Sequence, residues 1–563
     1  MKRQMRSTWI SLILIIAMLF MVSCSQTPQG SAPAPEVSEE TPAETATPSE
    51  QPEEDASKTG GIDRRGGDVI VVNNYVSTTL DPRLSNLLMA NYQWMQNVYE
   101  TPLAIDSSGR FYPQVCDFEY SDDGITLSLT VREESVFSNG EKVTIEDVIA
   151  TLETVAANND GFKTNFYENI ADQKVEGNTV TLTFHRLDPS TLDYLADLRG
   201  PCYIMPKAVI DKFGEGEFIS DVSDVIGSGP YVLKEYTPDV RVIVERNENY
   251  VPVLRDDVEG PAGTRHAHPD TITYAVNVDA ASRTAGLIAG DYTVGAVIPD
   301  MAPHAEEIGL TRFQLDNLWL PSIFFNLSDE NADSIVQNKD FRKAVRAALD
   351  MDAIMLSATH GEDGKYTLDP TPISPMNTDY HNNIIRDTEW NIADPVLAKK
   401  YLEASGYDGE EIVWMVSQSA TFYDAAVPAV QMLQDVGINV KLEVVDSGSH
   451  SSLRIDPTTG HDIGAWETQG AVINPITQRN LVLGVNGGWW ENEEKDNLLE
   501  IMRTTKTGSA ESIQAYKDFC ELITEEVPWI IWGLMRTTTF VQPGFNLNYQ
   551  GTSAYYWNSY FTE

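Results

Sequence analysis

Hydrophobic residues recur along this chain at two spacings, one typical of β-strands and one typical of α-helices. Apolar and polar positions alternate from Ile125 to Val131, which predicts a β-strand with one buried face. In "DFRKAVRAALDMDAIM" (340–355) the apolar residues recur instead at helical spacing. The run "AVPAVQMLQDVGINVKLEVVD" (426–446) predicts a helix, a glycine and then a strand. Helices and strands that alternate in this way indicate lobes of the α/β class.

Turn and capping residues divide this pattern into further elements. A short buried strand is expected at 69–72, a helix within 87–103 and a glycine-punctuated hairpin over 225–250. Thr144, with an acidic residue three positions later, predicts the start of a helix. Gly406 is expected to end another helix.

The N-terminus is apolar but too short to cross a bilayer. Lys2, Arg3 and Arg6 precede a mostly apolar run that spans 8–23. A spanning helix needs about 20 apolar residues, whereas a basic start followed by a short apolar run is typical of a secretory signal. We therefore expect 1–23 to be a signal peptide.

Cys24 stands where the apolar run ends. The stretch Met21–Cys24 resembles the bacterial lipobox, which implies cleavage before Cys24 and a diacylglycerol on its thiol. An ordinary signal peptide with an incidental cysteine is the alternative. Residues 24–65 are rich in Pro, Ser, Thr and Glu, so they predict a disordered acidic tether between a membrane and the body.

The formal net charge of −45 excludes several partners. A field of that sign repels nucleic-acid phosphates and anionic lipid headgroups. We therefore expect that the protein binds no nucleic acid and that it contacts the membrane only through its lipid.

Three cysteines remain in the body, Cys116, Cys202 and Cys520. Their number and spacing fit neither a metal cluster nor a disulfide scaffold, and whether two of them pair is left open.

Nine segments, in order along the body, resemble one family. Among them are "TLDPRLS" (79–85), "ITLSLTVREESVFSNGEKVTIEDVIATLE" (125–153), "GSGPYVLKEY" (227–236), "FRKAVRAALDMDAI" (341–354) and "HDIGAWETQG" (461–470). Together they are similar to the family 5 extracytoplasmic solute-binding proteins of ABC importers, the peptide- and nickel-binding group. Met351 stands where that family usually has Arg or Lys.

The resemblance implies an α/β fold of the periplasmic-binding-protein type (type II, cluster C). Two ligand-facing lobes joined by a hinge and a third, accessory lobe are expected. The first ligand-facing lobe would be discontinuous, and the divisions are placed no more finely than about ten residues. The first lobe would contain 66–104, 218–310 and 533–563, the accessory lobe 105–217, and the second ligand-facing lobe 311–532.

The resemblance also implies capture of a solute by lobe closure and delivery to a membrane permease and its ATPases. The chain contains no G-x-x-x-x-G-K-[ST] phosphate loop, so the ATPases would be separate proteins. We expect a monomer that is anchored outside the cytoplasm and has no cofactor or enzymatic activity.

Two other functions are alternatives to solute binding. One is a secreted hydrolase that uses Asp446, Ser449 and His450, and the other is a surface adhesin.

Aromatic and amide side chains are the candidates for the ligand-binding cleft, because such sites combine apolar walls with a few polar groups. The family pattern favours Trp466 most, with a core tryptophan as the alternative. The full set is Tyr75, Trp94, Trp319, Trp466, Gln469, Asn474, Trp489 and Trp490.

The run after Trp466 departs from the family pattern. Peptide binders of the family carry an Asp a few residues after this tryptophan, which pairs with the free amine of the peptide. Here "WETQGAVINP" has Glu467 and no Asp before Pro475. A peptide is the first expectation and an oligosaccharide the alternative.

A metal ligand set is not expected in this sequence. His266 and His268 in "RHAHPD" form the one close histidine pair, and two histidines on a polar loop are usually only solvated.

Overall fold

The computed structural model describes residues 64–562 apart from 75–76, 85–88, 199, 201, 214–216, 363, 419, 470–473, 478–487 and 551–552. The expected signal peptide, Cys24, most of the tether and Tyr75 therefore lie outside the described residues. Within the described part, no helix is long and apolar enough to cross a membrane.

A single twelve-stranded sheet runs through the described body. Two of its strands lie beside the main path, where β13 (Tyr366–Thr367) pairs with β18 and β17 (Trp529–Ile531) pairs with β12. From one edge to the other, the path is β15 (Val440–Val445), β14 (Ile412–Ser417), β16 (Ile463–Gln469), β12 (Thr311–Phe325), β18 (Leu534–Val541), β11 (Val294–Gly295), β1 (Asp68–Asn73), β10 (Thr271–Val276), β9 (Arg241–Arg246) and β8 (Tyr231–Thr237).

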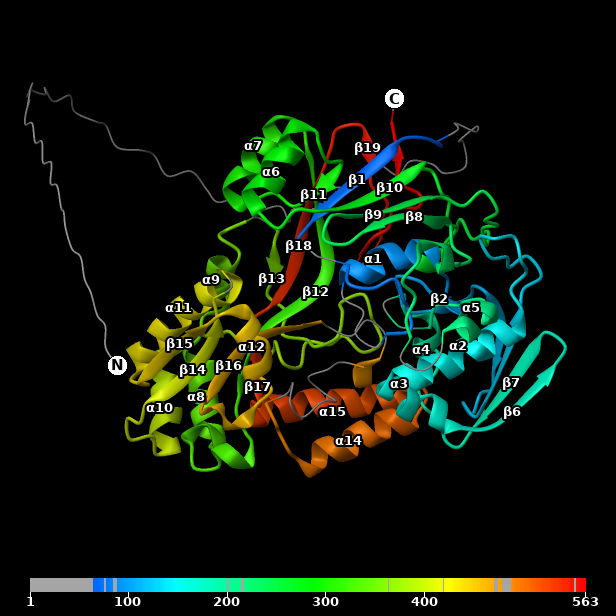
Figure 1. The fold of residues 1–563 in the computed structure, drawn as a ribbon. Coiled ribbons are helices and arrows are strands. Elements are labelled where there is room, and N and C mark those ends of the chain that lie inside the picture. The colour runs from blue at the N-terminus through cyan, green and yellow to red at the C-terminus, as the bar shows by residue number, and fades with distance from the viewer. Residues whose placement is uncertain are drawn as a thin grey trace, which may run out of the picture. The chain divides into compact units, whose positions relative to one another are not determined.

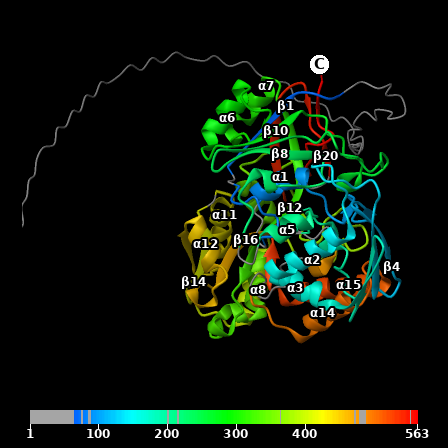
Figure 2. The ribbon, with the colours of Figure 1, turned by 45° about the vertical axis from the view of Figure 1, so that its right-hand side comes forward.

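The long strands β12 and β18 connect the two halves of this sheet. The first part of β12 pairs antiparallel with β18, from Thr311 opposite Val541 to Leu315 opposite Thr537. Its last part, from Trp319 onward, pairs with β16. The β12–β18 register shifts between Leu315 and Trp319. Figures 1 and 2 show β12 running from the group of β1 and β8–β11 toward the group of β14–β16.

A second sheet belongs to the expected accessory lobe, 105–217, which we call the accessory segment. Its order is β4 (Cys116–Tyr120), β5 (Thr126–Val131), β7 (Thr179–Phe184) and β6 (Ile170–Glu176). Side chains of β5 and β7 alternate between buried and half-buried, so one face is covered. The helices of this segment are α2 (Ile145–Asn158), α3 (Asp160–Asn165), α4 (Asp193–Ala196) and α5 (Lys207–Lys212).

The remaining helices lie around the large sheet. Those in the half that contains β1 are α1 (Met89–Val98), α6 (Ala280–Ala289) and α7 (Ala302–Glu307). Those in the half that contains β14 are α8 (Lys339–Ala348), α9 (Met351–Ala358), α10 (Pro395–Ser405), α11 (Ala420–Val436), α12 (Ser447–Leu453), α14 (Glu493–Thr504) and α15 (Ala510–Glu526).

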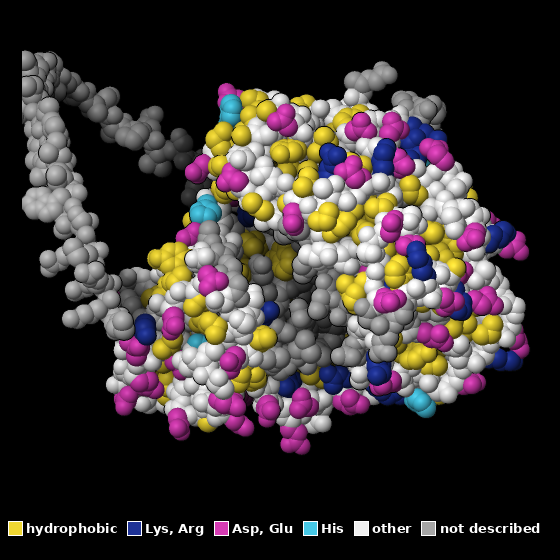
Figure 3. All heavy atoms as spheres, viewed as in Figure 1, with side chains coloured by type: hydrophobic (Ala, Val, Ile, Leu, Met, Phe, Trp, Pro, Cys, Tyr) yellow, Lys and Arg dark blue, Asp and Glu magenta, His cyan; other side chains and the backbone are white. Residues whose placement is uncertain are grey.

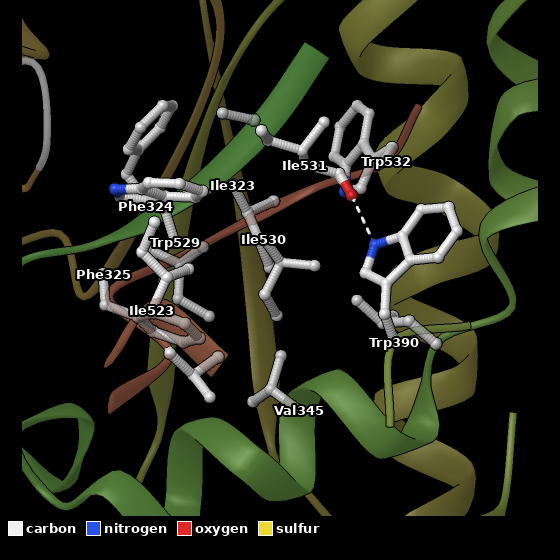
Figure 4. Packing of buried hydrophobic residues seen from close by; sticks show 14 of the residues in the cluster. Ile323, Phe324, Phe325, Val345, Trp390, Ile523, Trp529, Ile530, Ile531 and Trp532 are labelled. Atoms are coloured by element: carbon white, nitrogen blue, oxygen red, sulfur yellow. Dashed lines mark hydrogen bonds between the residues drawn. The ribbon is translucent and has the colours of Figure 1, made fainter. Parts of the chain in front are cut away.

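Three large clusters of buried hydrophobic residues form the core. The first lies between Leu320 and Leu534, the second combines residues near both ends of the body, and the third lies between Leu103 and Ile204. Figure 4 shows the first cluster, in which β12 and β17 pack over α8. There the Trp390 indole N–H donates to the Ile531 carbonyl at 2.8 Å. A buried indole thus fills the core and still satisfies its polar atom.

Local sequence rules account for several helix ends. Thr144 is the N-cap of α2, and its backbone N–H donates to the Asp147 carboxylate at 2.8 Å while its side chain accepts from the Asp147 N–H. Gly406 ends α10 with a φ of 78°, a left-handed conformation that glycine adopts without strain. Both predictions are confirmed.

The pattern over 340–355 forms two helices rather than one. The first, α8, ends at Ala348, and Asp350 then becomes the N-cap of α9 by accepting a hydrogen bond from the Ala353 N–H. Apolar spacing continues across the break because both helices pack into the same core. The capping aspartate nevertheless interrupts the helix, because its side chain accepts a hydrogen bond from a backbone N–H that would donate to a backbone carbonyl in a continuous helix.

The glycines of the predicted hairpin, Gly227 and Gly229, do not form its turn. The β8–β9 turn is at 237–240, whereas Gly227 and Gly229 precede β8 and lie against the end of α1. A Cβ added to Gly227 would stand 2.0 Å from the Val98 carbonyl oxygen. These glycines allow close approach of two backbones, which the sequence pattern alone did not reveal.

The three body cysteines, Cys116, Cys202 and Cys520, are all free and buried. The structure therefore answers the question that the sequence left open, because none of the three is paired. Burial raises the pKa of Cys520 to about 12 and raises those of the other two thiols further.

Replacing Thr144 with Ala should lower the free energy of unfolding by about 1 kcal/mol, because the capping box is lost. The urea midpoint, measured at constant m-value, checks this. Thr164→Ala is the matched control, since Thr164 is an exposed residue in α3 and should have little effect. Equal midpoints for the two variants would contradict the assigned role of the cap.

Candidate functional site

The face shown in Figure 3 is hollowed near its centre, between the half that carries α9–α11 and the side that carries α1–α3. Most of the predicted cleft residues lie in β12, in β16 or in the segment that contains Asn474 and Trp489.

Trp466 lies in β16 and is enclosed on both faces. Its ring stacks on Phe324 with centroids 4.0 Å apart and planes 6° from parallel. The guanidinium of Arg454, from the end of α12, lies 5.7 Å from the ring centroid. The side chain is only 3% exposed, and its indole N–H is buried without a hydrogen-bond partner. In this conformation Trp466 is part of the core, and it retains one unused donor.

Gly464 leaves the space that the Trp466 ring occupies. A Cβ at this glycine would stand 2.4 Å from the ring. The two residues have the same side-chain direction along the strand, so any larger residue at 464 would displace the indole. The Gly-Ala-Trp spacing of the motif therefore has a packing reason.

Trp319 and Trp466 belong to opposite faces of the sheet. In the β12–β16 pair, Trp319 lies opposite Gln469 and Ser322 lies opposite Trp466. Positions three residues apart in a strand project to opposite sides. The structure thus brings Trp319 beside the backbone of Gln469 and separates both from Trp466. Trp319 is half-buried.

Asn474 is buried and links two distant segments. Its side-chain N–H donates to the Thr507 hydroxyl at 3.1 Å, and its carbonyl accepts from the Ile476 N–H at 3.2 Å. The Thr507 hydroxyl in turn donates to the Pro189 carbonyl of the accessory segment at 3.4 Å. Asn474 therefore lies where the β14 half meets the accessory segment.

The tryptophan pair 489–490 packs within the half of the large sheet that contains β14. Trp490 is 7% exposed and lies 6.2 Å from the Phe519 ring. Trp489 is half-buried, and its ring lies 6.2 Å from that of His461. Gly488 has a φ of 76°, and a Cβ there would stand 2.2 Å from the Phe325 carbonyl oxygen. This glycine allows a close approach to the end of β12.

Two other candidates lie elsewhere. Trp94, in α1, is fully buried in the second core cluster, and its indole N–H donates to the Ser77 hydroxyl at 3.1 Å. It presents no surface to a ligand in this structure. Tyr75 is outside the described residues.

The histidine pair 266 and 268 forms a stacked contact, with ring centroids 5.5 Å apart. Burial, reinforced by His266 and nearby arginines, lowers the pKa of His268 to about 4. Among the described residues, no group of three or more His, Cys, Asp or Glu side chains is placed to hold a metal ion.

The Asp446, Ser449 and His450 group forms a helix cap. The Ser449 hydroxyl donates to the Asp446 carboxylate at 2.5 Å, and the Ser449 N–H donates to the same group at 3.0 Å. His450 is buried, and its Nε2 has no hydrogen-bond partner. A nucleophilic serine needs a base that accepts its proton, and here the serine hydroxyl donates to the capping aspartate instead.

Comparison with known families identifies the chain. A family model described as "Bacterial extracellular solute-binding proteins, family 5 Middle" matches residues 106–493. The chain belongs to family 5 of the bacterial extracellular solute-binding proteins.

Named relatives in this family agree with that assignment. The oligopeptide-binding protein AppA of Bacillus subtilis is 23% identical over 511 residues, which cover 84% of this chain and 87% of AppA. The glutathione-binding protein GsiB of Escherichia coli K12 is 24% identical, with 82% and 88% covered.

Solved structures of the family confirm the predicted fold class. The substrate-binding protein CtaP of Listeria monocytogenes superimposes with a TM-score of 0.74 at 19% identity, covering 89% of this chain and all of CtaP. AppA in complex with a nonapeptide gives 0.68 at 19% identity, with 89% of this chain and 100% of AppA covered. The fold is thus the α/β periplasmic-binding-protein type of family 5.

Sequence reasoning missed the partners of Trp466. Phe324 and Arg454 come from β12 and from the end of α12, and no local spacing connects them with the tryptophan. The "SIFFN" run signals a buried strand, but it does not identify which phenylalanine stacks.

Replacing Trp466 with Ala should lower the free energy of unfolding by about 3–5 kcal/mol, because the change leaves a cavity beside Phe324. Trp466→Phe keeps part of the stack and should cost less. Chemical denaturation of both variants measures the difference. Unchanged stability of the Ala variant would mean that the indole does not pack as described.

Proposed function

We propose that this protein is the capture subunit of an ABC import system and that it binds a peptide between its two ligand-facing lobes. The observation that carries the proposal is the division of the large sheet into two halves joined through β12 and β18. Family membership supports the transport role. Relatives described as oligopeptide-binding and as bound to a nonapeptide support the solute class.

The capture mechanism follows from a two-state hinge. A ligand shifts the balance between open and closed forms only by its difference in affinity for them. The irregular register between Leu315 and Trp319 lies in the strand that joins the halves, where a few backbone torsions can absorb the movement. Closure then excludes water from the solute and presents a distinct surface to the permease.

Energy for transport has to come from other proteins. The sequence contains no phosphate-binding loop of the G-x-x-x-x-G-K-[ST] type, so the proposed partners are a membrane permease and its ATPases. Lipid on Cys24 would hold the protein outside the cytoplasm beside them. The acidic, proline-rich stretch 24–65 would let the body reach both solute and permease.

An oligosaccharide is the second candidate solute. The stretch from Trp466 to Pro475 lacks the aspartate that peptide binders of the family use for a free amine. Tryptophan faces also suit the C–H groups of sugar rings. The two solute classes can be separated by one screen.

A screen with peptide and glycan libraries should find a ligand that raises the melting temperature of the protein. A ligand at 100 times its Kd adds about 2.7 kcal/mol of stability. We expect the peptide library to contain the stabilising ligand. A shift with glycans alone would support the oligosaccharide candidate, and no shift with either library would remove the support for capture of these solutes.

Replacing Cys24 with Ala should prevent lipid attachment, because the thioether cannot form. The variant should accumulate either as uncleaved precursor or as protein released into the medium, which immunoblotting of membrane and medium fractions measures. Cys520→Ala serves as the control, since that thiol is buried in the body. A Cys24→Ala protein that is still cleaved and membrane-bound would refute the lipid anchor.

A further inference from the structure

A cavity of about 700 Å³ lies between the accessory segment and α14. Its lining residues come from 159–200 on one side and include Ile476, Glu500 and Arg503 on the other. Figures 1 and 2 both show α3 close to α14 and α15. The volume is within the range of about 300–1,000 Å³ that is usual for small-molecule sites. None of the predicted cleft residues lines it.

Two arginines reach this cavity from opposite sides. Arg186 follows β7 in the accessory segment, and Arg503 is in the last turn of α14. Neither guanidinium has a hydrogen bond or an ion pair among the described residues. By contrast, the buried guanidinium of Arg342 donates to the Glu526 carbonyl at 2.6 Å. Unused guanidinium forks are suited to a carboxylate, which they bind by two parallel hydrogen bonds.

Four carboxyl groups also line the cavity, those of Asp188, Asp193, Asp197 and Glu500. Both carboxyl oxygens of Asp193 are buried without a hydrogen-bond partner. Burial, together with the charges of Asp197 and Asp188, raises the pKa of Asp193 well above its ordinary value. Burial also raises the pKa of Asp188 despite the opposing effect of both arginines. A raised pKa means that these two carboxyl groups are protonated over a wider pH range than ordinary aspartates, which weakens their repulsion of an anion.

Apolar groups line another part of the cavity. The rings of Phe162 and Tyr194 meet edge to face with centroids 5.8 Å apart. Ile476 adds a buried aliphatic side chain from the opposite side. The cavity therefore offers an apolar surface close to two unpaired cations. A solute group with a carboxylate beside an apolar side chain matches this arrangement.

We propose that this cavity holds the carboxyl-terminal end of a short peptide, with its free carboxylate on Arg186 and Arg503 and its last side chain against Phe162 and Tyr194. The inference rests on the proposed capture of a solute but places the carboxyl end of that solute between the accessory segment and α14, beyond the cleft between the two ligand-facing lobes. It narrows the solute to peptides with a free carboxylate and an apolar last residue. Because the two arginines belong to different parts of the fold, the carboxylate would also bridge them when the protein closes.

The test compares two matched peptide mixtures on the full-length protein. One mixture contains tri- to pentapeptides that end in Phe or Leu as free acids, and the other contains the same peptides as carboxyl-terminal amides. Calorimetric titration should show at least about tenfold weaker binding of the amides, since a charged hydrogen-bond pair is lost. Arg186→Gln and Arg503→Gln should each remove most of this preference, and Arg503→Lys should restore part of it.

Arg110→Gln is the matched control, because Arg110 is exposed in the turn between β2 (Leu103–Ile105) and β3 (Phe111–Pro113) and does not line the cavity. It should keep the full preference for the free acids. Both cavity arginines are partly or fully exposed, so their variants should melt near the wild-type temperature without ligand.

The possible failures are distinguishable. Equal binding of acids and amides by the wild type, or an unchanged preference in both arginine variants, would overturn the assignment of the cavity and leave peptide capture standing. If a glycan mixture binds and the peptides do not, the inference falls together with the peptide solute. If neither class binds the wild type, the proposed capture function itself fails.

Discussion

The antiparallel ladder between β12 and β18 is the constraint on which the architecture depends. It makes one continuous sheet out of two groups of strands, one around β1 and β10 and one around β14 and β16. Each group has its own hydrophobic cluster, so each can stay rigid while the joining strands bend. A break in β12 would therefore affect the relation between the halves more than the packing within either half.

The accessory segment is held to the first half by a buried polar network. Glu100 accepts hydrogen bonds from the Ser228 hydroxyl at 3.0 Å and the Tyr250 hydroxyl at 3.2 Å, and it also accepts from the Gln114 amide. Arg255 donates to the Gln114 side chain at 3.0 Å. Buried networks of this kind are costly to break. On the other side, the residues after α14 reach the accessory segment through the 3.4 Å hydrogen bond from Thr507 to Pro189 and a 3.8 Å ion pair between the exposed side chains of Lys506 and Asp122. These contacts are weaker than the buried network, so we expect the accessory segment to move with the first half.

Short-range signals in the sequence predicted short-range structure. Thr144 and Gly406 were correctly identified as helix ends because a cap depends on residues within one turn. Asp350 was missed because its cap competes with an apolar pattern that continues through it. The stack of Trp466 on Phe324 joins two strands that are distant in sequence, and only the fold specifies that pair. For the same reason the motifs indicated the family but not which cleft candidates share a face.

If the cavity beside α14 holds one end of the solute as proposed, its position limits the length of the solutes that this protein can carry. If the accessory segment moves with the first half when the hinge closes, the distance between Arg186 and Arg503 changes, because these arginines line opposite walls. A solute that is too long would hold these walls apart and keep the hinge open, and one that is too short would leave a guanidinium without its carboxylate. Solute length, and not only solute chemistry, would then decide which complexes adopt the closed form that a permease can recognise.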